Sequence, residues 1–335
     1  MASSNFKTVP LFYDGFEAKA FDRPFGRFYS SCRGTLRYAY RTARKRQPFT
    51  GYYTAFRNLQ RSLETLGVEV RINDFGYARR NPEAPIGLSG YPTVFDRVQL
   101  PNPGVFGPGF VPPPDQIEET IAKNNLQVVT LPSEWPCKIW RPTLGDKVAP
   151  LFVGIDLDAW PDQSGEAKDI DVSVYDKIRW NRPAREADVL APVQAHLKAQ
   201  NLSSIYLRYG AHHLGGFRDA LRRARSLVFL CEHETQGLAY QEAMASGVPV
   251  LAWDDGKLID PHQSRFAPEA LVVSSVPYFD ERCGARFRSG EFAETFDRFW
   301  TDLPKYRPRQ FVHEVLSLEA CGRRYLTLLE RAANA

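Results

Sequence analysis

The spacing of apolar and polar residues predicts strands and helices in the first half of the chain. Residues 7–14 form an apolar run of the kind found in a buried strand. From residue 51 onwards apolar side chains recur with the period of a helix, and Gly67 ends that helix before a second strand. A further strand is expected to end near Ser133. The first half therefore predicts a domain of mixed α/β structure.

The second half of the chain alternates more regularly between strands and helices. Short connections join the expected elements, which is typical of a parallel sheet covered by helices on both faces. The polar segment 161–169 has no periodicity and is the expected domain boundary. The expected strands are 171–175, 204–209, 226–230 and 248–253, and the expected helices lie near 187–199, near 216–224 and from about residue 238.

Two further segments carry other signals. Residues 101–114 contain six prolines and three glycines, which predicts a loop. Gly104, Gly107 and Gly109 do not have the spacing of the dinucleotide-binding fingerprint. Residues 309–332 carry an apolar face at helical spacing, and we expect one long amphipathic helix there.

Composition is that of a soluble globular protein. The chain has 335 residues, of which 43% are hydrophobic and 24% charged, and this length suits two domains. No apolar run approaches the roughly 18 residues of a membrane-spanning helix, and the start lacks the pattern of a signal peptide. The five cysteines are scattered without a CxxC pair, which predicts reduced core thiols in a cytoplasmic protein.

Positive charge is concentrated in one segment. Residues 19–80 contain 14 Lys/Arg and 4 Asp/Glu, although the net charge of the whole chain is only +4. Arg33, Arg37 and Arg41 fall on one face of an expected helix at 33–46. This face is either a solvated surface or a contact with an anionic partner, and it predicts peripheral contact with an anionic membrane surface such as the inner face of the plasma membrane. Nucleic acid is not an expected partner.

The turn after the expected strand 226–230 carries the most specific chemistry. It reads Cys-Glu-His-Glu-Thr-Gln-Gly, and the next helix begins near Gly237. In doubly wound sheets ligands bind beyond the carboxyl ends of the strands. A helix start offers free N–H groups to a phosphate, and glycine lets the backbone approach a ligand closely. Glu234 and Glu242 can accept hydroxyl hydrogen bonds nearby, so the turn fits a ligand that carries both a diphosphate and hydroxyl groups.

This stretch resembles the E-x₇-E signature of the retaining GT-B glycosyltransferases, in particular glycosyltransferase family four. Residues 50–70 resemble the family's glycine loop and first helix, and residues 129–135 followed by 150–160 resemble its passage from the last strand of the first domain through a Gly-Ile-Asp linker. The resemblance spans most of the chain, but only the C-terminal signature is highly specific. The matching signature positions are Glu234, Gly237, Glu242, Ala243, Met244, Ala245, Gly247, Pro249 and Val250.

The resemblance implies a fold and a set of residue roles. The fold would be α/β of the GT-B type, with two Rossmann-like doubly wound domains facing each other across a cleft. The expected domains are an acceptor-side domain at 1–160, a domain that binds the nucleotide-sugar at 161–310, and a helix at 311–335 that crosses back to the first. Glu234 would be the catalytic residue beside the donor sugar, and the other donor-binding residues would be Glu242, Gly237, Leu238, Lys177, Arg179, Arg182 and Gly51.

The sequence departs from the family pattern at two places. Relatives carry an Arg and a Lys five positions apart to neutralise the diphosphate, whereas Lys177 and Arg182 have this spacing in reversed order, with Arg179 between them. Many relatives also have a histidine near the donor sugar in the first domain, but all six histidines here lie in the C-terminal half. Which cations bind the diphosphate therefore stays open.

The expected function is transfer of a sugar from a UDP- or GDP-linked donor to a glycan or lipid-linked acceptor, with retention of configuration. The donor is a substrate, so no cofactor is expected. No metal is expected, because His233-Glu234 does not complete an HExxH motif and Asp156-Leu157-Asp158 lies in the expected linker. His212-His213 and Asp254-Asp255 are assigned to loop packing and turns. Two alternatives are a GT-B epimerase or hydrolase of nucleotide-sugars and a non-catalytic protein that binds a sugar nucleotide.

Overall fold

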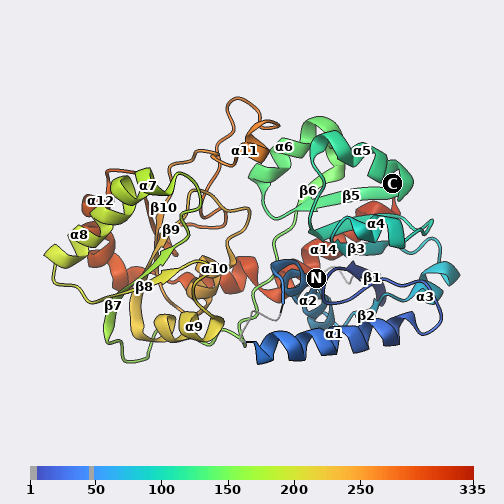
Figure 1. Ribbon diagram of the computed structural model, residues 1–335, viewed down its shortest axis with the longest axis horizontal. Helices are drawn as coiled ribbons and strands as arrows, with labels where there is room; N and C mark the ends of the chain where they lie inside the picture. The colour runs from blue at the N-terminus through green and yellow to red at the C-terminus, as the bar shows by residue number, and fades with distance from the viewer. Residues whose placement is uncertain (1–5, 45–48) are drawn as a thin grey trace. The chain divides into compact units, whose positions relative to one another are not determined.

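The structure is a computed structural model that describes residues 6–44 and 49–335. The chain divides into two compact units. The first contains the residues up to Gly154 together with Leu318–Ala335, and the second contains Ile155–Ser317. Each unit has its own sheet and its own apolar core. The predicted pair of doubly wound α/β domains is therefore confirmed (Figure 1).

The described part of the first unit contains a sheet of six parallel strands in the order β2-β1-β3-β4-β5-β6. Strand β1 is buried along nearly its whole length because β2 and β3 flank it and helices cover the sheet. The strands are β1 Thr8–Asp14, β2 Glu69–Ile72, β3 Ile86–Gly90, β4 Gly104–Gly109, β5 Leu126–Leu131 and β6 Val148–Pro150. The helices are α1 Gly26–Ala43, α2 Gly51–Thr65, α3 Phe75–Arg80, α4 Thr93–Arg97, α5 Pro114–Lys123, α6 Glu134–Leu144 and α14 Leu318–Ala333.

Strand β4 corrects the prediction of a loop at 101–114. It is a central strand, hydrogen-bonded to β3 on one side and to β5 on the other. Its glycines are required by close packing. A Cβ at Gly104 would lie 2.8 Å from Leu126, and a Cβ at Gly107 would collide with the hydroxyl of Thr130. The same glycines that disfavour a strand in solution therefore allow this one to fit between its neighbours.

Helices α2 and α14 pack together on one face of this sheet (Figure 1). The predicted apolar stripe of α2 is buried at Phe56, Leu59 and Leu63. Gly322 of α14 lies against the backbone of α2, because a Cβ there would collide with the carbonyl oxygen of Ser62. This close approach joins the C-terminal helix to the core of the first unit.

Helix α1 corrects the predicted orientation of the arginine face. Arg33 donates a hydrogen bond to the carbonyl oxygen of Phe16 at 3.0 Å, and Arg37 lies 3.5 Å from the buried carboxylate of Glu17. The predicted face therefore points toward the rest of its unit rather than toward solvent. Glu17 can attract these arginines because it lies in the loop after β1, which the spacing of the helix alone does not reveal. The end of the expected helix at residues 45–46 lies outside the described residues.

The described part of the second unit contains a sheet of five parallel strands in the order β11-β10-β9-β7-β8. The predicted alternation of strands and helices is confirmed here. The strands are β7 Ile170–Asp176, β8 Ser204–Arg208, β9 Ala224–Leu230, β10 Val250–Trp253 and β11 Gly284–Phe287. The helices are α7 Arg182–Arg185, which continues through a π-helical turn into α8 Ala191–Ala199, then α9 Leu214–Arg223, α10 Leu238–Ala245, α11 Pro261–Ser264, α12 Phe292–Asp302 and α13 Pro308–Phe311.

The two points where the chain passes between units lie side by side. Ile155 and Ser317 form a β-bridge, and the amide of Ile155 donates to the carbonyl oxygen of Leu316 at 2.8 Å. Ser317 is extended, so the single long helix predicted at 309–332 is instead α13 with a π-helical turn, followed by α14. Residues 155–160 go with the second unit, since Arg309 donates to the carbonyl oxygens of Leu157 and Trp160. The chain therefore passes into the second unit before the polar segment 161–169, where the domain boundary was expected.

The burial of the cysteines and the character of the helices bear on two predictions from the sequence. Four of the five cysteines are buried, but Cys32 on α1 is exposed, so the prediction of core thiols is wrong for this residue. Within the described residues, none of the helices combines the length and the apolar character that crossing a membrane requires.

Candidate functional site

The candidate site lies at the carboxyl ends of β7 and β9. From β7 the chain passes to β8 on one side of it and then to β9 on the other, so the topological switch point of the sheet lies between β7 and β9. Asp176 and Leu230 are paired at the ends of these strands, and the amide of Lys177 donates to the carbonyl oxygen of Leu230 at 2.8 Å. Ligands of doubly wound sheets bind at such a switch point. The loops that follow, from Lys177 and from Cys231, carry most of the predicted residues.

Gly237 shapes the start of helix α10. Its φ of +84° lies in the left-handed region, and a Cβ there would collide with the ring of Tyr240. Glycine is therefore required by both backbone and packing. No side chain caps α10, and in the described chain the amides of Leu238 and Ala239 have no hydrogen-bond partner. The start of α10 thus offers backbone N–H groups to a ligand, as predicted from Gly237 and Leu238.

Lys177 and Glu234 form an ion pair in which both side chains are largely buried. The Lys177 ammonium also lies 4.6 Å from the centre of the Tyr209 ring, and the amide of Glu234 donates to the carbonyl oxygen of Ser274 at 2.9 Å. Burial lowers the pKa of Lys177, but the negative charge of Glu234 and the hydrogen bond to it outweigh burial, so the pKa is raised. The predicted catalytic carboxylate is thus held against one of the predicted cations.

Arg179 joins the two loops and keeps its charge uncompensated. Its backbone amide donates to the buried carboxylate of Glu232, and its guanidinium donates to the carbonyl oxygen of His233 at 2.5 Å. The guanidinium also lies 4.2 Å from the centre of the Trp180 ring. Over the described part of the chain, its guanidinium forms no ion pair with a carboxylate, and the residue is exposed. Arg179 therefore presents a positive charge to solvent at the switch point.

Arg182 is engaged differently. Its guanidinium binds the carboxylate of Asp176 through two nitrogens, at 2.8 and 2.6 Å, and lies 3.7 Å from Glu186. The hydrogen bond to Asp176 raises the pKa of Arg182 despite partial burial. Because Asp176 is buried at the end of β7, this pair fixes the loop that carries Lys177 and Arg179. Two carboxylates compensate the positive charge of Arg182.

Glu242 lies in the second turn of α10, and its side chain is half-buried. Burial raises the pKa of Glu242 to about 8, although the positive charge of Arg218 lowers it in part. Among the described residues no hydrogen bond or ion pair to its carboxylate is formed. A desolvated carboxyl group without a partner is costly, and such groups are concentrated at ligand sites.

The loop after β9 is further fixed by His233. Its ring stacks on Trp180 with centroids 4.8 Å apart, and its Nε2 accepts a hydrogen bond from the amide of Asp260. Burial, together with the positive charge of Arg179, lowers the pKa of His233 to about 4. The imidazole is therefore neutral at pH 7 and acts as a packing residue with an acceptor nitrogen.

Gly51 belongs to the first unit, as the first residue of α2. In the described chain no heavy atom lies within 4 Å of the position that a Cβ at Gly51 would occupy. The preceding Thr50 caps the helix by accepting from the amide of Tyr53, which leaves the amides of Gly51 and Tyr52 without partners in the described residues. Packing does not require a glycine here, so open space above the backbone is consistent with close approach of a ligand.

The other polar pairs serve local structure. Asp254 accepts from Ser274 and from the amide of Ser275, and Asp255 accepts from Ser289. His213 caps α9 by accepting from the amide of Gly216. The assignment of these residues to turns and loop packing is confirmed. Over residues 6–44 and 49–335, no group of three or more His, Cys, Asp or Glu side chains could hold a metal ion. Metal independence stays a prediction.

Three residues that shape the site were not predicted from the sequence. Glu232 is buried and accepts hydrogen bonds from the backbone amides of Arg179 and Trp180. In the sequence, its position two residues before Glu234 was the signal that could have pointed to it. Tyr209 packs on Lys177, and Arg218 is the positive charge acting on Glu242. These contacts join loops that are far apart in the sequence, so spacing alone does not reveal them.

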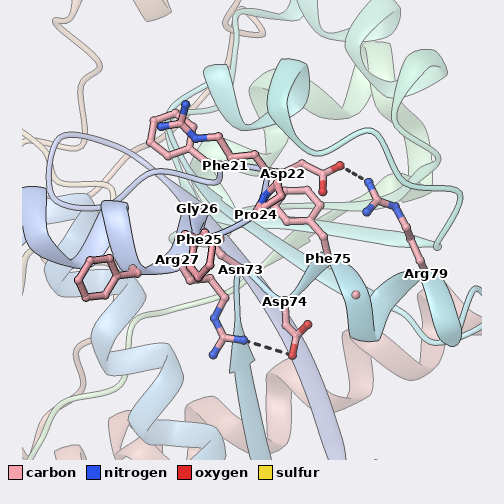
Figure 2. Close-up of a pocket in the computed structure, with 13 residues that line it drawn as sticks. Phe21, Asp22, Pro24, Phe25, Gly26, Arg27, Asn73, Asp74, Phe75 and Arg79 are labelled. Atoms are coloured by element: carbon pink, nitrogen blue, oxygen red, sulfur yellow. Dashed lines mark hydrogen bonds and ion pairs between the residues drawn. The ribbon is translucent and has the colours of Figure 1, made fainter.

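The described part of the first unit contains a pocket of about 670 Å³ that is separate from these residues. It lies beyond the carboxyl end of the edge strand β2, between the start of α1 and the start of α3. Figure 2 shows Phe25 and Phe75 at this pocket, with Arg27 paired to Asp74 and Arg79 paired to Asp22. Two of its three arginines are paired with carboxylates, and the third, Arg23, lies over the rings of Phe21 and Tyr29, so the pocket differs from the open cation and amides at β7 and β9.

Comparison with solved structures identifies the type of fold. No family model and no curated protein matches the sequence. Among solved structures, the apo form of the lipopolysaccharide outer core galactosyltransferase WaaB matches with a TM-score of 0.51 at 9% identity, over 96% of this chain and 99% of that one. The Glycosylation Associate Protein (Gap123) complex from Streptococcus agalactiae matches with a TM-score of 0.50 at 9% identity, over 78% of this chain and 57% of that one. At these identities the likeness shows the fold alone, and it is the GT-B fold that the sequence resemblance implied.

Proposed function

We propose that the protein is a glycosyltransferase that moves a sugar from a nucleotide-sugar donor to an acceptor hydroxyl. The proposal rests on the closeness of two features along α10: the carboxyl group of Glu242 and the uncapped start of the helix. A carboxyl group without a partner lies one helical turn from backbone amides that also lack partners. A nucleoside diphosphate satisfies both, since its hydroxyls donate to a carboxylate and its phosphate oxygens accept from N–H groups.

The donor would bind along the carboxyl edge of the second sheet. Glu242 would accept hydrogen bonds from the ribose hydroxyls, while Gly237 and Leu238 would donate to the sugar or the phosphate. Gly51, with open space above it, would let the first unit's α2 approach the donor phosphates. Glu234 would lie beside the transferred sugar, where its charge stabilises the developing positive charge at the anomeric carbon.

The diphosphate would be neutralised chiefly by Arg179, with Lys177 beside it. Arg179 is exposed and bears an uncompensated charge, whereas Lys177 shares its charge with Glu234. Arg182 is bound to Asp176 through two hydrogen bonds, so it would act mainly by fixing the loop on which the other two cations lie. We therefore propose that Arg179 is the cation that faces the leaving group.

In the proposed reaction the bond between the anomeric carbon and the diphosphate oxygen breaks, and the acceptor oxygen bonds to the same carbon with retention. The acceptor's proton leaves with the diphosphate. Binding and orientation of the two substrates, together with stabilisation of the leaving group, would supply most of the rate. No metal would be needed, because Arg179, Lys177 and the amides of α10 supply the positive charge.

The acceptor would be a glycan or a lipid-linked sugar. WaaB is a lipopolysaccharide outer core galactosyltransferase, and its fold spans nearly the same length as this chain. A UDP- or GDP-linked hexose is the proposed donor class, and the proposed location is the cytoplasm or the cytoplasmic face of a membrane.

The experiment that tests the proposal is a screen of UDP- and GDP-sugars for an increase in unfolding temperature, with and without EDTA. A donor that binds only the folded protein raises the unfolding temperature according to its concentration and dissociation constant. We expect one nucleotide class to stabilise the protein equally in both conditions. If no nucleotide-sugar stabilises it, the proposal fails.

Product analysis then distinguishes the reactions that use the same donor. Without an acceptor, a hydrolase consumes the nucleotide-sugar fully and an epimerase brings it to equilibrium with its epimer, whereas a transferase consumes it only slowly. We expect consumption to rise sharply when glycan acceptors are supplied, and replacement of Glu234 with Gln to lower the rate by about 10²–10³.

A second candidate function is a non-catalytic protein that binds a sugar nucleotide. The observation favouring it is that two of the three predicted cations, Lys177 and Arg182, are already paired with carboxylates. Tight donor binding with no turnover under any acceptor would support this candidate. Slow donor hydrolysis that disappears in Glu234→Gln would exclude it.

A further inference from the structure

Helix α1 exposes an apolar surface beside its arginine face. The exposed fractions are 85% for Phe25, 70% for Phe28, 52% for Tyr29, 73% for Leu36 and 54% for Tyr40. With Cys32, which is also exposed, these positions recur every three or four residues and therefore share one side of the helix. We call this set the α1 stripe: Phe25, Phe28, Tyr29, Cys32, Leu36 and Tyr40.

The chain segment that carries the α1 stripe has charges of a single sign. Residues 23–44 contain six arginines and no acidic residue. Arg33 and Arg37 face inward, whereas Arg23 and Arg44 lie over rings of the stripe, 4.9 Å from the centre of Tyr29 and 5.0 Å from the centre of Tyr40. The side chain of Arg27 is 66% exposed. An apolar stripe flanked by arginines is typical of a helix that lies in the surface of an anionic membrane.

Phe25 is an independent sign that the surface has a partner. It has a φ of +58°, which is a strained conformation for a bulky side chain, and its ring is almost entirely exposed. The folded unit therefore gains little packing from a residue that costs it free energy. Phe25 and Phe28 line the pocket beyond β2 together with Arg27 and its partner Asp74, so the stripe ends at a hollow rimmed by aromatic rings and an ion pair (Figure 2).

We propose that the α1 stripe docks on the surface of a bilayer that contains anionic lipid. The rings and Leu36 enter the boundary of the acyl region, and Arg23, Arg27 and Arg44 contact lipid phosphates. The helix lies on the membrane and does not cross it. A second copy of this chain is a poorer occupant, because two copies would bring like-charged arginines together and residues 23–44 contain no acidic residue to separate them. The inference differs from the sequence prediction in the face that contacts the membrane, and it is independent of the proposed function.

Binding to vesicles tests the proposal without an assay of activity. Cys32 is the one exposed cysteine of the five, all of which lie in the described chain, so an environment-sensitive fluorophore can be attached to it. We expect a blue shift and co-sedimentation with vesicles of phosphatidylcholine and phosphatidylglycerol in equal parts, and neither with phosphatidylcholine alone. Phe28→Ser/Leu36→Ser should weaken the partitioning by more than about 10-fold. The matched control Leu214→Ser/Val272→Ser removes exposed apolar side chains of the second unit and should bind as the unaltered protein does.

Phe25→Gly separates loss of docking from loss of folding. Glycine adopts a positive φ without strain, so this variant should have a higher unfolding temperature and yet bind anionic vesicles more weakly. Equal binding to neutral vesicles, or unchanged binding of Phe28→Ser/Leu36→Ser, would overturn the proposal. So would absence of vesicle binding accompanied by a concentration-dependent increase in mass, since the stripe would then be a contact between copies.

Discussion

The ammonium of Lys177 and the carboxylate of Glu234 form an ion pair at the point where the second sheet changes strand order. One residue follows β7 and the other follows β9, so the pair joins the two loops that a donor would contact. In the absence of a ligand each charge is compensated by the other. The donor would therefore enter a site whose proposed catalytic carboxylate is already oriented.

This pair predicts a strong coupling between two substitutions. Lys177→Met leaves a buried carboxylate without its partner and should reduce the free energy of unfolding by about 3 kcal/mol. Glu234→Gln should also be destabilising, but the double variant should be more stable than the sum of the two losses implies. Urea denaturation of the four proteins measures the coupling. Strictly additive losses would show that the two side chains do not interact.

Gly237 and Gly51 should respond in opposite ways to alanine. Gly237→Ala places a side chain in the left-handed region and against Tyr240, and we expect a loss of about 2–4 kcal/mol in unfolding free energy. Gly51→Ala puts a methyl group into open space in a helix, so stability should be unchanged or higher by up to about 1 kcal/mol. If α2 approaches the donor, Gly51→Ala should nevertheless raise the KM for the donor. A stable Gly51→Ala variant with unaltered kinetics would remove this residue from the site.

Arg179 and Arg182 provide a matched test of which cation binds the diphosphate. Arg179→Met should weaken UDP or GDP binding by about 10- to 100-fold with little effect on folding, because the residue is exposed and its guanidinium forms no ion pair with a described residue. Arg182→Met leaves Asp176 unpaired and should instead reduce unfolding free energy by about 3 kcal/mol. Calorimetry and urea denaturation of both variants measure the two effects. The reverse pattern would show that Arg182 is the cation that faces the ligand.

His233 predicts a dependence of stability on acid. Its folded-state pKa of about 4 lies below the ordinary value of 6.5, so the unfolded chain binds the proton more readily. Its contribution to stability is present above pH 6.5 and is lost as the pH falls through about 4, by up to about 3 kcal/mol. The difference in unfolding free energy between the unaltered protein and His233→Gln should therefore shrink from pH 7 to pH 4. A constant difference would mean that the imidazole titrates normally in the fold.

Much of the fold and part of the site could be predicted from sequence. The alternation in the second half and the turn from Glu234 to Glu242 were specified locally, because strand, glycine and helix start follow one another along the chain. Strand β4 could not be predicted, since its glycines are explained by Leu126 and Thr130, which come from a neighbouring strand. The inward direction of Arg33 and Arg37 likewise depends on Phe16 and Glu17, which approach only in the folded unit.

The carboxylates that pair with the predicted cations also could not be predicted from the sequence. The spacing of Lys177 and Arg182 identifies them as a pair, but their contacts with Glu234 and Asp176 depend on where the loops turn. Glu232 was overlooked because a carboxylate that binds backbone amides has no sequence signature of its own.

The central claim is that Glu242 accepts hydrogen bonds from the hydroxyls of a nucleotide donor. Its pKa of about 8 is raised from the ordinary range, so the carboxyl is mostly protonated at pH 7 in the free protein. The folded protein favours the neutral form of this carboxyl group, and the resulting contribution to the free energy of unfolding is lost as the pH rises through about 8. Donated hydroxyl hydrogen bonds favour the ionised form, so binding should release a proton at pH 7.

Calorimetric titration with UDP and GDP, for the unaltered protein and Glu242→Ala, measures this claim most directly. We predict that the alanine variant binds the preferred nucleotide about 10- to 100-fold more weakly and no longer releases a proton on binding. Equal affinity and equal proton release in the two proteins would contradict the account.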